Sequence, residues 1–154
     1  MHSRIFQINE NPIEKSDYIE ESTYWDHWFT NSIADYVNDN CDRDDDIKWL
    51  KDCAKGCSVG CDENGEYLII ENKEEYFKNS FARFQELLDK IKDCTLQDFT
   101  KGIFEMYGLK NAYDEKFGFY METDGYGLIT MDDFVRNFPE NVKFYIGGTI
   151  DYHC

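Results

Sequence analysis

The sequence has little of what marks disordered, secreted or membrane-spanning chains. Only two of its 154 residues are proline, and no segment is rich in Pro, Gly and Ser together. No run of about 18 apolar residues occurs, so no segment is suited to cross a membrane as a helix. The first residues are not followed by the apolar stretch of a signal peptide. We therefore expect one domain over residues 1–154, located in the cytoplasm.

Basic residues are also scarce. The chain has 16 Lys and Arg against 32 Asp and Glu, a net charge of −16. This magnitude exceeds the roughly 2 to 8 units that keep a small domain soluble. A surface of this charge repels nucleic acid and anionic membranes and attracts basic proteins from a distance. We therefore expect a basic protein partner and no direct binding of nucleic acid or membrane, whereas the oligomeric state stays open.

The apolar residues are sufficient for a packed core and alternate in recognisable patterns. Apolar side chains make up 42% of the chain and aromatic ones 17%. Alternation predicts strands over 4–8 and 142–152, and hairpins over 59–70 and 117–131, with turns at Asn64-Gly65 and Asp124-Gly125. Gly147-Gly148 inside the last strand predicts a kink or bulge. The fold class we expect is α+β, a single domain with a mostly antiparallel sheet, two hairpins and four to five helices, the helices on one face.

Helical periodicity appears in five places. It predicts helices over about 17–38, 44–54, 72–91, 95–108 and 132–138. In the first, Trp25, Trp28, Phe29, Ile33, Tyr36 and Val37 share one stripe and should be buried. In the third the stripe is Phe77, Phe81, Phe84, Leu88 and Ile91, after a cap at Asn72. In the fourth, Leu96, Phe99, Ile103 and Tyr107 should face inward, before a stop at Gly108.

Two short patterns suggest a metal-binding module as an alternative. Residues 122–133 resemble an EF-hand calcium loop, with Asp124 and Gly127 at positions that match and Asp133 at position twelve, where it is one methylene shorter than the usual Glu. Glu122 and Tyr126 depart from the pattern at positions one and five. A hairpin turn followed by a capped helix accounts for the same residues without a calcium ion. Cys53, Cys57 and Cys61 have a spacing that zinc permits, although six free thiols in a reducing compartment are the simpler interpretation. We expect no metal and no cofactor.

Catalytic motifs are missing from the sequence. The only histidines are His2, His27 and His153, and two of these lie near the termini. No Gly-rich phosphate loop, Gly-x-Ser-x-Gly or His-Glu-x-x-His occurs. The abundant carboxylates do not single out an acid and a base. We therefore expect a binding protein and not an enzyme, although a pocket with a perturbed carboxylate would revive the enzyme hypothesis.

The distribution of acids indicates the expected binding face. Residues 1–66 carry a net −10 and residues 67–154 a net −6. Acids along a helix face roughly imitate the spacing of backbone phosphates, although a merely solvated face is the plain alternative. Tyr18, Tyr24 and Trp49 are candidates for desolvated aromatic contacts. The predicted partner-binding residues are Glu20, Glu21, Asp35, Asp39, Asp42, Asp44, Asp45, Asp46 and Trp49.

Three segments of the first third carry a resemblance. His2–Ile8, Ser32–Val37 and Asp44–Leu50 look like segments of small acidic proteins of bacterial mobile elements. Such elements carry acidic inhibitors of host defence, including anti-restriction and anti-CRISPR proteins. The resemblance implies an inhibitor that binds the basic nucleic-acid-binding surface of a host defence nuclease, in the cytoplasm of the bacterial host. The alternatives are an immunity protein that neutralises a basic toxin, and a calcium- or zinc-binding module.

Overall fold

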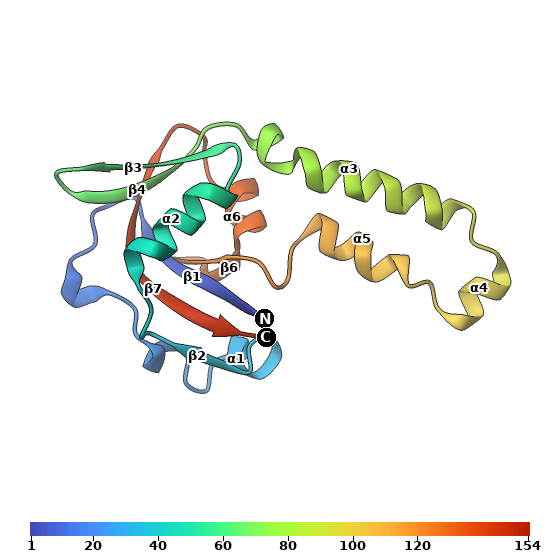
Figure 1. The fold of residues 1–154 in the computed structure, drawn as a ribbon, viewed down its shortest axis with the longest axis horizontal. Coiled ribbons are helices and arrows are strands. Elements are labelled where there is room, and N and C mark those ends of the chain that lie inside the picture. Colours follow the sequence, from blue (N-terminus) through green and yellow to red (C-terminus); the bar gives the residue numbers. More distant parts are fainter.

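The computed structural model describes all residues 1–154 and has two visibly different parts. Residues 1–72 and 114–154 form a sheet with helices packed on it, which we call the sheet body. Residues 73–113 form a helical hairpin that projects from one side, which we call the helical arm (Figure 1). The two chain ends lie side by side in the sheet body, where the Met1 amino group donates to the Cys154 carbonyl oxygen.

The sheet has seven strands, and almost all neighbouring pairs are antiparallel. The strands are β1 (His2–Asn9), β2 (Tyr36–Asn38), β3 (Cys57–Asp62), β4 (Gly65–Ile70), β5 (Tyr120–Thr123), β6 (Gly127–Thr130) and β7 (Lys143–His153). Their order is β3-β4-β7-β1-β5-β6, with β2 added beside the end of β7. Only β1 and β5 run parallel. The α+β class, the mostly antiparallel sheet and both hairpins are thus confirmed, although the first turn consists of Glu63 and Asn64, one residue earlier than expected.

A bulge at Gly147-Gly148 lets β7 serve both faces of the sheet. Opposite this pair the register passes from Phe6↔Thr149 to Ile8↔Ile146, so β7 contains one extra residue. Because successive side chains alternate between faces, the extra residue turns the later part of the strand over. Phe144 and Ile146 therefore belong to one core cluster, whereas the following apolar residues of β7 belong to the other.

Helices cover one face of the sheet, and mostly irregular chain covers the other. The α-helices are α1 (Trp28–Ser32), α2 (Arg43–Cys53), α3 (Lys73–Lys92), α4 (Leu96–Lys101), α5 (Glu105–Tyr113) and α6 (Met131–Asn137). On the first face, α2 and α6 bury Leu50, Phe134 and their neighbours against β1, β4 and β7. On the second face, the segment around Tyr24 and Phe29 packs against β1, β5 and β7.

The helix expected over 17–38 does not form, and this prediction was wrong. The segment contains two 3-10 turns (Lys15–Asp17 and Glu21–Tyr24), the five-residue α1 and strand β2. Polar side chains bond to nearby backbone groups here and compete with a continuous helix. Thr23 and Glu20 form a reciprocal cap, the His27 ring accepts from the Phe29 amide, and Asp26 has a φ of 59°.

The expected helix over 95–108 is broken, which raises the number of α-helices to six. Gly102 adopts a φ of 93°, a left-handed conformation that ends α4. Gly108 does not end a helix, because it lies inside α5, where an added Cβ would come within 3.3 Å of Leu87 Cδ1. Leu96, Phe99 and Tyr107, expected to be buried, are 72–80% exposed. The caps at Asn72 and Thr95 are confirmed.

Candidate protein-binding surface

Residues 10–45, which we call the acidic segment, concentrate exposed carboxylates. The segment has eleven acids and only two basic residues, Lys15 and Arg43. Ten of the acids are exposed and Glu21 is half-buried. The exposed ones are Glu10, Glu14, Asp17, Glu20, Asp26, Asp35, Asp39, Asp42, Asp44 and Asp45. In Figure 1 the segment runs in blue shades from the end of β1 to the start of α2.

Arg43, one of the two basic residues of this segment, is bound to groups outside it. Arg43 donates to the Ile146 and Gly147 carbonyl oxygens, at 2.7 Å each, and therefore holds the bulge of β7. Its ion-pair partner is Glu66, at 3.0 Å, outside the segment, and its guanidinium also lies over the ring of Tyr18, 5.4 Å from the centroid. Only Asp35 contacts a side chain that can carry a positive charge, the His153 ring at 3.1 Å. The other ten carboxylates of the segment have no basic side chain at ion-pair distance, so their field is not compensated locally.

Backbone contacts bring the predicted acids together in two groups. Asp39 Oδ2 accepts from the Glu21 amide at 3.2 Å, which joins the turn containing Glu20 and Glu21 to the end of β2. Asp35 lies at the other end of β2, where its backbone amide donates to the His153 carbonyl oxygen at 2.7 Å. A second group stands at the start of α2, where Asp42 caps the helix by accepting from the amides of Asp44 and Asp45. There the helix dipole favours anions.

Asp46, which we predicted to contact a partner, belongs to the interior. Its carboxyl group is 3% exposed, forms an ion pair with Arg4 and accepts from Thr149 Oγ1 at 2.8 Å. Arg4 also pairs with Asp151 of β7. These contacts tie α2 to both central strands, so the prediction that Asp46 binds a partner is corrected.

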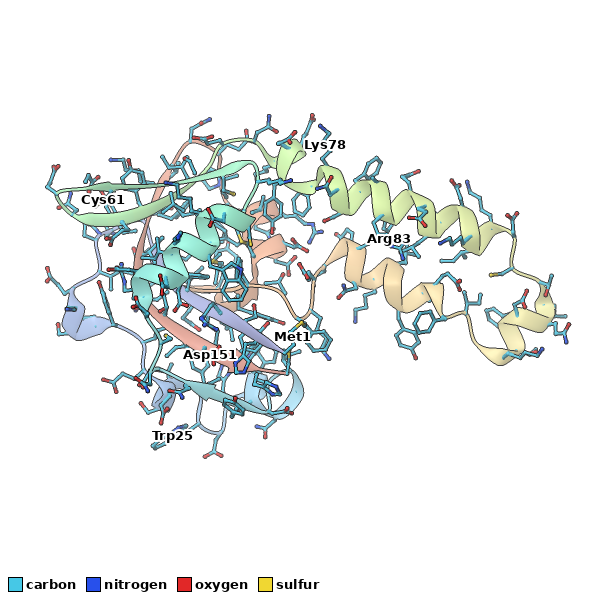
Figure 2. The ribbon with its side chains drawn as sticks, in the orientation of Figure 1. Met1, Trp25, Cys61, Lys78, Arg83 and Asp151 are labelled. Atoms are coloured by element: carbon cyan, nitrogen blue, oxygen red, sulfur yellow. The ribbon has the colours of Figure 1, made fainter.

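The exposed aromatic side chains differ from those expected. Tyr24 is fully buried and donates to Glu122 Oε2 at 3.1 Å, and burial raises its pKa. Trp49 is 36% exposed, with the Arg4 guanidinium over its ring and its edge against Phe119. The acidic segment itself exposes Trp25 at 68%, Trp28 at 50% and Tyr36 at 48%. Figure 2 shows Trp25 projecting from the lower edge of the sheet body.

Helical periodicity predicts that these three aromatic residues are buried, and this prediction is wrong. The signal that opposes burial is the density of Ser, Thr, Asp, Asn and His between residues 16 and 35. Those side chains favour caps and turns over a continuous helix. Only Phe29 of the predicted stripe is fully buried.

The residues of the two metal hypotheses have other contacts. Glu122 accepts from Tyr24, Asp124 accepts from the Asn9 amide at 2.5 Å, and Asp133 pairs with Arg136. Cys57 packs against the core, whereas Cys53 and Cys61 are exposed. Nowhere does the structure assemble three or more His, Cys, Asp or Glu side chains around a common point that a metal could occupy.

One cavity is lined by two carboxylates whose pKa values are raised by burial, Asp132 and Glu115, and perturbed carboxylates are the feature an enzyme would need. The cavity has a volume of about 290 Å³ and is lined by Trp49, Cys53, Tyr76 and Asp132, among others. Burial raises the pKa of Asp132. Both of its oxygens are engaged, Oδ1 by the Tyr76 hydroxyl at 2.9 Å and Oδ2 by the Glu115 amide at 2.8 Å. Asp132 thus joins the first helix of the helical arm, and the segment that follows the arm, to α6.

Comparison with known proteins gives this chain no relative. No family model, no curated protein and no solved structure matches it. None of its helices combines the length and the apolar character that crossing a membrane requires.

Proposed function

We propose that the protein is an acidic inhibitor that binds the basic nucleic-acid-binding surface of another protein. The observation that carries this proposal is the acidic segment, in which ten carboxylates lack a basic neighbour and three large aromatic side chains are exposed. Burying charges on binding requires opposite charges to compensate them. A surface lined by Lys and Arg supplies these charges.

Long-range attraction and short-range contact have separate sources in this surface. Exposed carboxylates steer a basic partner toward the segment and raise the association rate. Because screening acts over about 8 Å at physiological ionic strength, this contribution weakens as salt is added. Trp25, Trp28 and Tyr36 supply the desolvated contacts, because aromatic side chains dominate the binding energy of protein interfaces.

The irregular placement of these acids supports competition with nucleic acid through their negative charge. It does not support a copy of the regular spacing of backbone phosphates. Glu20 and Glu21 lie at the start of a 3-10 turn, and Asp35 and Asp39 lie in the loops on either side of β2, so the four have no regular spacing. Only Asp42, Asp44 and Asp45 stand at a helix, in or just before its first turn. We therefore propose that nucleic acid and this protein compete for the same cationic groove.

The resemblance to acidic proteins of mobile elements favours a host defence nuclease as the partner, in the manner of anti-restriction or anti-CRISPR inhibitors. The same surface would also suit an immunity protein bound to a basic toxin. The two functions differ in the partner, because an immunity protein is encoded beside its toxin.

The test is affinity capture from a bacterial lysate, with the intact protein as bait. Nucleic-acid-binding proteins should be retained at low salt and released at high salt, and added duplex DNA should compete for them. The control bait carries Asp44→Lys and Asp45→Lys, which reverse two exposed charges at the start of α2. If the retained proteins were indifferent to DNA and equally retained by the control bait, the proposal would be wrong.

A further inference from the structure

The helical arm carries no net charge, although the chain is strongly acidic. Residues 73–113 contain seven acids and seven bases, so the sheet body holds the entire −16. Four ion pairs lie within α3 alone: Glu75–Lys78, Arg83–Glu86, Lys90–Glu86 and Lys92–Asp89. The arm therefore does not share the electrostatic character of the acidic segment, and it offers a basic partner little attraction.

The arm also leaves most of its apolar residues uncovered. Leu87 is its only fully buried side chain. Seven of the fourteen exposed large hydrophobic residues of the protein belong to it, at 51–82% exposure: Phe81, Leu96, Phe99, Phe104, Met106, Tyr107 and Tyr113. Two helices side by side bury only the stripe between them. A cavity of about 290 Å³ beside Phe77, Phe81 and Phe84 remains open on the flank of the pair.

Both ends of the arm contact α6 at its base. The Arg136 guanidinium lies over the rings of Phe77 and Tyr113, at 4.7 Å and 4.1 Å, and donates to the Tyr113 carbonyl oxygen. Lys73 Nζ donates to the Arg136 carbonyl oxygen at 2.9 Å. Together with the Asp132 contacts, these bonds join both ends of the hairpin to the sheet body, and Figure 2 shows the rest of the arm extending away from it.

We propose that the arm binds the arm of a second copy of this chain, so that the two helical hairpins form an antiparallel four-helix bundle. A bundle of this kind covers the apolar stripes that a single hairpin leaves exposed. The seven exposed side chains offer on the order of 900 Å² per arm, at about 200 Å² for a full aromatic side chain. A stable interface of standard size needs about 800 Å² from each partner.

Charge determines both the partner and its orientation. Two sheet bodies of −16 repel each other, so two copies associate most easily through the one region that is neutral. In a parallel arrangement the bodies would meet at the same end of the bundle. In an antiparallel arrangement the length of α3, roughly 30 Å, separates them by several times the screening length of about 8 Å. The dimer then presents two acidic segments, which favours a partner with two basic sites.

The test is sedimentation of the full-length protein from about 1 µM to about 200 µM, a range that detects interfaces of ordinary quality. The wild type should be dimeric at the upper end, at low and at high salt alike. Phe81→Glu in α3 and Tyr107→Glu in α5 should each weaken the dimer at least tenfold. The matched control is Trp25→Glu, which makes the same change at a residue of similar exposure on the sheet body and should leave the dimer intact.

Circular dichroism checks that each variant is folded, which is expected because all three side chains are exposed. A wild type that stays monomeric over the whole range would overturn the proposal. The exposed apolar side chains of the arm would then be assigned to the binding of a different protein. A dimer that resists both arm variants would also overturn it, as would a dimer whose small-angle scattering shows the two bodies in contact. Capture of basic proteins by the acidic segment is a separate readout and does not depend on this result.

Discussion

Asp46 offers the sharpest test of how the interior is held together. Replacing it with Ala removes one of the two ion-pair partners of Arg4, whose side chain is 19% exposed, and the acceptor of the buried Thr149 hydroxyl. Removing one member of a buried ion pair costs about 3–5 kcal/mol. Arg4 keeps Asp151, so we expect the lower end, about 3 kcal/mol. For a chain of this size that lowers Tm by about 6–12 °C.

The assay is thermal unfolding followed by circular dichroism at neutral pH, with Asp44→Ala and Asp45→Ala as controls. These residues lie in the same first turn of α2 but are exposed. Each control loses only a favourable charge near the helix dipole, about 0.3–1 kcal/mol. An Asp46→Ala variant whose Tm stays within the range of the two controls would refute the structural role assigned to Asp46.

Three further predictions concern a titrating group, the thiols and the bulge. Burial raises the pKa of Asp132 above that of the unfolded chain, so the folded state binds this proton more tightly and stability falls as pH rises through the folded pKa. Asp132→Asn should therefore reduce the fall of Tm from about pH 4 upward, and an unchanged slope would contradict this. Burial raises the pKa of Cys57 to about 12, so a thiol reagent at mildly alkaline pH should label Cys53 before Cys57 in peptide mass spectrometry; equal labelling would argue against a packed Cys57. A Cβ added to Gly148 would lie 3.0 Å from the Ile19 backbone nitrogen, so Gly148→Ala should cost about 1–3 kcal/mol in chemical denaturation, and an unchanged free energy of unfolding would contradict this close approach.

Local patterns predicted the elements that carry their own signals. α2 begins at a capping Asp and buries Ile47, Leu50 and Ala54 at helical spacing. The two hairpins follow from alternating residues around short polar turns. The Gly-Gly pair in β7 indicated an irregularity. The resulting change of face was not predicted, because it depends on which residue of β1 lies opposite.

The errors arose where tertiary contacts or side-chain capping outweighed periodicity. Asp46 lies one helical turn before Leu50, on the same side of α2, so the helical spacing contained the signal for its burial. Its partners, Arg4 and Thr149, are far away in the sequence and could not be identified from it. The apolar residues of the arm were expected to be buried, but most of them are exposed. An apolar stripe on a helix indicates that the stripe is covered, but it does not indicate whether residues of the same chain cover it.

The most direct test of the proposed function compares association rates with a captured partner. The protein is measured in three forms: wild type, Asp44→Lys with Asp45→Lys, and Glu74→Lys with Glu75→Lys. The two variants make the same charge change in the first turn of a helix, α2 or α3, at exposed positions. We predict that only the α2 variant slows association, at least tenfold in about 50 mM salt and less in about 500 mM. Equal rates for the wild type and the α2 variant, or a loss confined to the α3 variant, would contradict binding through the acidic segment.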